Sequence, residues 1–184
     1  MNLRLAILDA APGLKVKQVV QPAVLARLSP KVRRAFETKE IEWGDDRGIW
    51  GLSFSLRDSG VRIGHRKGDH IAQHPKAHGM SDQEASRILC LHIEGVLLHE
   101  LGHAILDTLD QEDLDYFAQM ASNWDPVSTY EGHGDTSTAV DVFHERFADA
   151  FRWWVTNPNY IKQLSASWAA LCKVVLDSAE AALR

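Results

Sequence analysis

The stretch Val96-Leu97-Leu98-His99-Glu100-Leu101-Gly102-His103-Ala104-Ile105-Leu106 carries the strongest pattern in the sequence. Two histidines stand four residues apart among apolar residues, and positions at this spacing lie one turn apart on the same face of a helix. The capping box Ser81-Asp82-Gln83-Glu84 precedes an apolar-periodic segment that runs into this stretch. We therefore predict a long, largely buried helix from residue 81 to about residue 107.

The two histidines of this helix, His99 and His103, can present their imidazoles to one metal ion. Catalytic zinc sites use three protein ligands and keep a fourth position for water. Glu100 stands beside the histidines, where it can act as general base on a metal-activated water. The pattern predicts a catalytic zinc site on this helix, and the alternative is a pair of surface histidines on an amphipathic helix.

A third zinc ligand has to come from elsewhere in the chain. The spacing of the metzincin class would place it six residues after His103, where Leu109 stands, so that class is excluded. The favoured candidate is Glu145, which lies in a predicted helix over residues 138–156. Three other side chains of zinc-binding type stay open as alternatives: His133, Asp135 and His144.

Asp149 stands four residues after Glu145, so the two carboxylates share one helix face. Asp149 could then accept a hydrogen bond from a zinc-bound imidazole and fix the orientation of its ring. Periodicity alone favours a solvent-exposed face for both acids, whereas the need for a third zinc ligand favours an inward one. Ala148 leaves room for a neighbouring helix, and Gly102, which costs about 1 kcal/mol against alanine within a helix, also predicts a close helix–helix approach.

The first part of the chain shows patterns of strands and turns. Residues 14–20 and 48–56 alternate at period two and predict strands, and residues 61–64 are expected to form a return strand after a turn at 58–60. Ser29-Pro30 predicts a capped helix that runs to about residue 38. The polar, histidine-rich residues 67–80 are expected to form a loop.

The second part of the chain is predicted to be helical. Besides the helix over 138–156, we expect helices over residues 111–124 and 160–183, each bounded by a proline or a polar turn. The fold class is therefore α+β, in a single domain over residues 1–184. A small N-terminal mixed sheet would be followed by the active-site helix and a helical C-terminal half.

Composition and charge narrow the classes of function. The chain has 184 residues, of which 45% are hydrophobic and 24% charged, as in one soluble globular domain. A formal net charge of -5 without a basic stripe argues against a nucleic-acid partner. The longest apolar stretch, residues 88–98, contains His92 and Glu94, and no signal peptide is recognisable, so we expect a cytoplasmic protein with no membrane partner.

Two motifs of this sequence resemble those of the gluzincin zinc metallopeptidases: Leu98-His99-Glu100-Leu101-Gly102-His103 and Glu145-Arg146-Phe147-Ala148-Asp149-Ala150-Phe151. They are most similar to the small catalytic domain of anthrax lethal factor and its bacterial and phage-encoded relatives. The resemblance covers residues 81 to about 165. It implies a zincin-like fold, a Zn2+ ion bound by His99, His103 and Glu145, and Glu100 as the general base.

The family also places a tyrosine before the glutamate helix, where it hydrogen-bonds the transition-state oxyanion. Tyr130 is the candidate for this role, although it stands fifteen residues before Glu145, farther than in the family pattern. His133, between two glycines, is a second candidate. The resemblance also implies that an extended peptide binds along a sheet edge, formed by residues 61–64 or by residues 48–56.

These patterns predict a zinc-dependent metalloendopeptidase that acts on a peptide or protein substrate. The alternative is a zincin-fold module of a phage or mobile element, with a structural, virion-associated or regulatory role and with secondary or lost peptidase activity. The complete set of His99, Glu100, His103 and Glu145 favours the enzyme. No pattern specifies an oligomer or a virion assembly, and both stay open.

Overall fold

The computed structural model describes residues 14–43, 55–57, 60–63, 82–127 and 138–183. This part of the chain is mostly helical and contains one small sheet of two parallel strands, in agreement with an α+β class. In chain order the elements are η1 (Val16–Gln18), α2 (Pro22–Leu25), α3 (Pro30–Glu37), β1 (Glu40–Trp43), β2 (Gly60–Ile63), α5 (Asp82–Leu106), α6 (Gln111–Ala121), α7 (Ala139–Thr156), α8 (Pro158–Leu164) and α9 (Ala166–Ala182).

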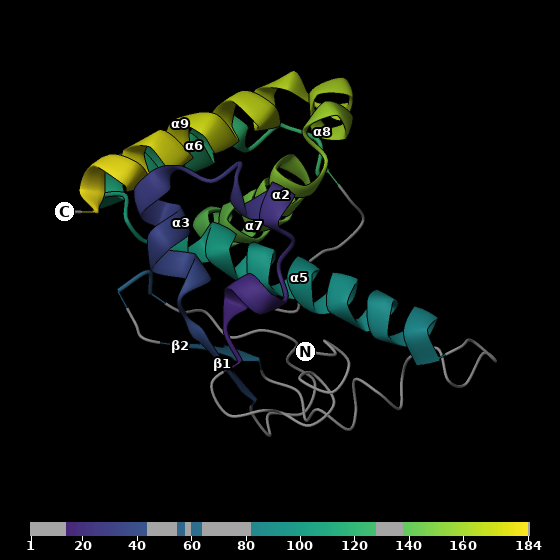
Figure 1. The fold of residues 1–184 in the computed structure, drawn as a ribbon. Coiled ribbons are helices and arrows are strands. Elements are labelled where there is room, and N and C mark those ends of the chain that lie inside the picture. The colour runs from purple at the N-terminus through teal and green to yellow at the C-terminus, as the bar shows by residue number, and fades with distance from the viewer. Residues whose placement is uncertain (1–13, 44–54, 58–59, 64–81, 128–137, 184) are drawn as a thin grey trace.

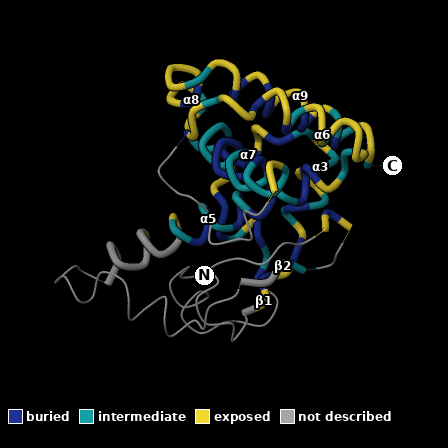
Figure 2. Tube along the Cα trace, turned by 180° about the vertical axis from the view of Figure 1, so that it is seen from behind, coloured by how far each residue is buried: buried dark blue, intermediate teal, exposed yellow. Residues whose placement is uncertain are grey.

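Helices α5 and α7 form the middle of the molecule. They lie between the sheet on one side and helices α6, α8 and α9 on the other (Figure 1). The same order is visible from behind, where the outer turns of α6, α8 and α9 are exposed and the second half of α5 is largely buried (Figure 2). The two middle helices are therefore covered by other elements along much of their length.

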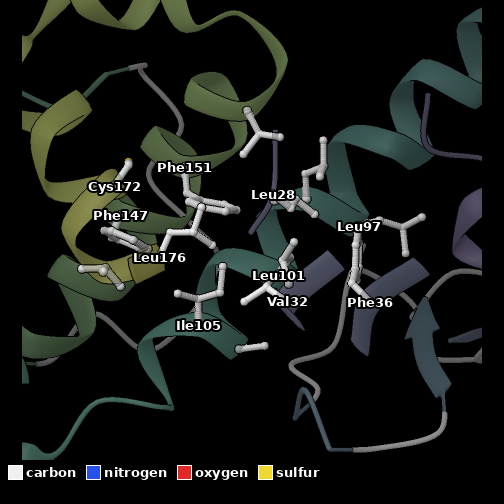
Figure 3. Packing of buried hydrophobic residues seen from close by; sticks show 14 of the residues in the cluster. Leu28, Val32, Phe36, Leu97, Leu101, Ile105, Phe147, Phe151, Cys172 and Leu176 are labelled. Atoms are coloured by element: carbon white, nitrogen blue, oxygen red, sulfur yellow. The ribbon is translucent and has the colours of Figure 1, made fainter. Parts of the chain in front are cut away.

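The hydrophobic core gathers around the second half of α5. Its buried residues come from the N-terminal helices, from α5, from α7 and from α9, and Figure 3 shows them facing one another. The core side chains labelled there are Leu28, Val32, Phe36, Leu97, Leu101, Ile105, Phe147, Phe151, Cys172 and Leu176. Because each is 5% exposed or less, this burial is the main force that holds α5 against its neighbours.

An aromatic row on α7 joins this helix to α9. Phe143, Phe147 and Phe151 follow one another at helical spacing, with successive ring centroids 6.0 Å apart. Trp168 of α9 stacks on Phe143 at 6.3 Å and meets the ring of Trp124 edge-on at 5.2 Å. The indole N–H of Trp168 donates to a backbone carbonyl at 2.9 Å, which satisfies the one polar group of this fully buried side chain.

The strand expected over residues 14–20 is wrong. This segment contains the short helix η1 and an isolated antiparallel bridge between Lys15 and Glu40. Val16, Val19 and Val20 are buried, at spacings of three and four residues, which is the spacing of one helical face. The side chain of Gln18 also accepts from the backbone N–H of Lys15 at 2.7 Å, which closes the turn.

The helix expected from Ser29-Pro30 is confirmed as α3, with Pro30 at its first position, but its capping group is not the serine. The Ser29 side chain makes no capping hydrogen bond to the backbone. Instead, the carboxylate of Glu180 on α9 accepts from the backbone N–H groups of Lys31 at 2.8 Å and Val32 at 3.3 Å. The carboxylate of Glu180, distant in the sequence, thus caps the N-terminus of α3, a function that a neighbouring side chain usually has.

The sheet differs from the expected hairpin. Strand β2 includes Val61, as predicted, but it pairs in parallel with β1, in the register Ile41 with Val61. Residues 48–54 and the turn residues 58–59 lie outside the described residues, and residues 55–57 form a turn rather than a strand end. The predicted loop at 67–80 also lies outside them, so the described sheet has two strands.

In the second part of the chain, helices α5, α6 and α7 correspond to the predicted helices, whereas the last predicted helix does not. Helix α5 ends at residue 106, as predicted, and α7 begins after Thr138, whose side chain accepts from the N–H of Asp141. Helix α6 ends three residues earlier than expected. The single helix predicted over 160–183 is wrong: Ser165 is extended, ends α8 and caps α9 by accepting from the N–H of Trp168.

Candidate metal centre

The candidate site lies where α5 crosses α7. A Cβ atom placed on Gly102 would lie 2.7 Å from the Cα atom of Ala148, which is closer than packed atoms approach. The predicted close approach of two helices at Gly102 is therefore confirmed. Because no side chain separates the two backbones at this point, residues one turn away on each helix can reach the same small volume.

Three side chains bring their donor atoms together at this crossing. His99 and His103 come from one face of α5, and their Nε2 atoms are 3.2 Å apart. Glu145 of α7 places one carboxylate oxygen 3.4 Å from the Nε2 of His99 and the other 3.6 Å from the Nε2 of His103. Among the described residues these three form the one group of possible metal ligands, with all donor atoms within 4.8 Å of one another.

The ionisation of these groups suits the binding of a cation. Burial, and then the neighbouring imidazole of His99, lower the pKa of His103 to about 4, against an opposing effect of the Glu145 carboxylate. The hydrogen bond from His99 lowers the pKa of Glu145, and it outweighs the effect of burial. At neutral pH His103 is thus a neutral imidazole and Glu145 a carboxylate, which are the forms that bind metals.

Glu100 is buried beside this donor set and is not part of it. Its side chain is 7% exposed, on the helix turn that carries His99. Burial raises the pKa of Glu100 to about 7; the His99 imidazole opposes this shift and the Glu145 carboxylate adds to it. A carboxyl with a pKa near neutrality can take up and release a proton at ordinary pH, as a general base must.

Asp149 faces inward, so the interpretation of its helix face as a solvated surface is wrong. The side chain is buried, and Nη2 of Arg152 donates to its Oδ1 atom. The predicted hydrogen bond from a zinc-bound imidazole to Asp149 stays a prediction. The partner Arg152 was not anticipated from the sequence, although the spacing of three residues between opposite charges could have indicated it.

His144, an alternative ligand in the sequence, lies beside the donor set. Its ring is nearly parallel to that of His103, at 15°, with the centroids 6.0 Å apart. It does not belong to the described group of three. Burial raises the pKa of Asp107, which follows the last residue of α5, four residues after His103, and His144 opposes this shift. The sequence did not single out Asp107.

Three further candidates lie outside the described residues: Tyr130, His133 and Asp135. The proposed oxyanion role of Tyr130 or His133 and the alternative ligand roles of His133 and Asp135 therefore stay predictions. Of the two candidate edges for a peptide, β2 is described and residues 48–54 are not.

Comparisons with protein-family models, with curated proteins and with solved structures find no match for this chain. In the described residues, the helices are all too short or too polar to cross a membrane.

Proposed function

We propose that this protein is a zinc-dependent metallopeptidase. The observation that carries the proposal is the convergence of His99, His103 and Glu145 from two helices, with a buried carboxyl of raised pKa, Glu100, on the adjacent position. The small sheet lies on the other side of α5 from α6, α8 and α9 (Figure 1). This position supports the zincin-like arrangement that the resemblance of the sequence motifs implies. The substrate class in this proposal is a peptide or protein chain.

The donor set fits a zinc ion. Two imidazole nitrogens and one carboxylate are a known ligand combination of catalytic zinc, which keeps a fourth position open. Ligands at about 2.1 Å from a tetrahedral ion are about 3.4 Å from one another. The distance of 3.2 Å between the two Nε2 atoms, and the distances of 3.4 and 3.6 Å from these atoms to the two oxygens of the Glu145 carboxylate, are close to this value.

The chemistry can be assigned to the residues of the chain. Zinc, when bound, supplies a Lewis acid that polarises a carbonyl and lowers the pKa of water. Glu100 accepts the proton of the attacking water and passes it to the leaving amine, for which a pKa near 7 is well matched. In this proposal Asp149 orients one imidazole, and Tyr130 or His133 donates a hydrogen bond to the oxyanion.

The test separates metal binding from hydrolysis. The purified protein is expected to hold about one zinc ion per chain, to lose it on His99→Ala, and to keep it on Glu100→Gln. Of these three proteins, only the unchanged chain should cleave a denatured protein or a peptide library. His92→Ala, seven residues earlier on the same helix, and Glu112→Gln, on the exposed side of α6, are the matched controls.

Two results would count against the enzyme. Hydrolysis that survives Glu100→Gln would exclude the general-base role of this residue. Zinc binding without cleavage of any peptide would favour the alternative of a structural or regulatory module. Absence of zinc from the unchanged protein, and failure to bind added zinc, would remove the metal centre itself.

A further inference from the structure

We propose that Arg152 is a positioning residue of the metal centre: it holds the buried Asp149 carboxylate at the level of His99 and so helps to set the metal affinity. The inference rests on the metal-binding part of the proposed function. It does not depend on peptidase activity, so the two can fail separately.

Two contacts between the helices show how α7 is aligned with α5. His144, early in α7, lies beside His103, late in the active-site helix. Arg152, two turns later in α7, lies against Gly95, two turns earlier in α5: a Cβ on Gly95 would be 3.8 Å from both Cδ and Nη1 of the arginine. The two helices therefore run in opposite directions across their contact.

This alignment places Asp149 near His99. Glu145 reaches both histidines of the motif, and Arg152 reaches Gly95, one turn before His99. Asp149 stands between Glu145 and Arg152 on the same face of α7. Its buried carboxylate is thus at the level of the first histidine, where an imidazole bound through Nε2 needs an acceptor for its other ring nitrogen.

Arg152 is a partner of this carboxylate. The Asp149 side chain is 3% exposed and the Arg152 side chain 30% exposed, and Nη2 of the arginine donates to Oδ1 of the aspartate. The guanidinium also lies 5.3 Å from the centre of the Trp153 ring. The Nε atom of Arg152 is buried and has no acceptor among the described residues. The contacts with Asp149 and with the indole of Trp153 therefore hold the guanidinium in position.

The Arg152–Asp149 pair can serve either the stability of α7 or the orientation of a metal ligand. Replacing a buried ion pair by apolar groups is often neutral or stabilising, so such pairs are poor devices for stability alone. Partners that orient metal ligands, by contrast, typically contribute about 10- to 100-fold in metal affinity. The position of the pair, on the face of α7 that carries Glu145 and with Asp149 one turn beyond it, favours this second role.

The experiment uses Arg152→Met, Asp149→Asn and the double variant. Zinc affinity is measured by competition with a chelator, and the stability of the metal-free protein by urea unfolding. Arg152→Met should weaken zinc binding about tenfold or more and destabilise the metal-free protein, because it takes the guanidinium charge away from a buried carboxylate. Arg152→Lys, which keeps the charge, should restore much of the affinity.

The double variant separates positioning from packing. It removes both charges, so the metal-free protein should regain stability while zinc affinity stays low. Zinc affinity equal to that of the unchanged protein, in Arg152→Met or in the double variant, would overturn the inference. If Arg152→Met does not fold, Arg152→Gln takes its place, and zinc affinity equal to that of the unchanged protein would again overturn the inference.

The matched control is Lys173→Met, which breaks an exposed ion pair with Asp177 on α9. This change should leave zinc affinity unaltered. Failure of the unchanged protein to bind zinc at all would remove the metal centre and, with it, this role of Arg152.

Discussion

Gly102 of α5 and Ala148 of α7 are in backbone contact: a Cβ atom on the glycine would lie 2.7 Å from Cα, 3.2 Å from Cβ and 3.3 Å from the carbonyl oxygen of the alanine. The three candidate ligands lie one turn or less from this contact. Because two come from one helix and the third from the other, the separation of the helices sets the distance between the imidazoles and the carboxylate of Glu145.

Gly102→Ala should therefore destabilise the protein. The added methyl group has to push against backbone, and overpacking of this kind typically costs about 1–3 kcal/mol. Gly95→Ala is the matched control in the same helix, since its Cβ would make an ordinary contact of 3.8 Å with Arg152. It should be neutral or stabilise by up to about 1 kcal/mol. Urea unfolding measures both, and similar losses for the two variants would contradict the close contact.

The N-terminus of α3 gives a second prediction. Glu180→Ala removes the acceptor for the N–H groups of Lys31 and Val32 and should cost about 1 kcal/mol, as the loss of a helix cap does. Asp177→Ala, on the same helix and outside this contact, is the control.

The contribution of Glu180 should also depend on pH. Desolvation is the largest single effect and raises the pKa of Glu180, but the hydrogen-bonding groups of Ser29, Lys31 and Val32 and the charge of Lys31 together lower the pKa below its ordinary value of 4.5. The stabilisation is therefore present above pH 4.5 and is lost as the pH falls through the lowered pKa. An effect of Glu180→Ala that stays constant down to pH 2 would contradict the cap.

Helix α5 and its partner α7 were predictable because their signals are local. The histidine pair in an apolar-periodic segment predicted α5, and Thr138 predicted the start of α7. The candidate ligand Glu145 could be named because zinc requires a third donor, and no periodicity would have chosen it. Gly102 predicted the crossing because glycine within a helix needs a compensating contact.

Three features of the fold could not be predicted, because the sequence pattern at each of them fits more than one structure. The parallel pairing of β1 with β2 places Ile41 beside Val61, and alternation alone does not determine the direction of pairing. The break at Ser165 was hidden because helix-forming residues continue on both sides. The inward position of Asp149 was ambiguous because acids and an arginine at helical spacing also describe a solvated face.

A third prediction concerns the buried carboxyl of Glu100 in the metal-free protein. Burial raises its pKa in the folded protein to about 7, above the ordinary value of 4.5. The stability that the group contributes is fully present below pH 4.5 and is lost as the pH rises through 7, because the unfolded chain releases the proton first. Glu100→Gln should therefore stabilise the metal-free protein by about 1–3 kcal/mol at pH 8 and by little at pH 4.5.

The measurement is urea unfolding of both proteins across this pH range, in the presence of a chelator. The lowered pKa of His103 affects the two proteins alike, so it largely cancels in the difference. Glu112→Gln, at an exposed position, should show no such trend. A difference between the unchanged protein and Glu100→Gln that does not vary with pH would contradict the raised pKa.

The last prediction tests the donor set through stability. An ion that binds only the folded chain stabilises it by mass action, by about 2.7 kcal/mol when its free concentration is 100 times Kd. Zinc should thus raise the midpoint of thermal unfolding, and a chelator should lower it. His103→Ala and Glu145→Gln each remove a donor of the group and should abolish the zinc-dependent shift. Magnesium should produce little shift, since it favours oxygen ligands over imidazole. A zinc-dependent shift that survives both substitutions would place the ion at other residues, and the convergence of the two helices at Gly102 would then need another explanation.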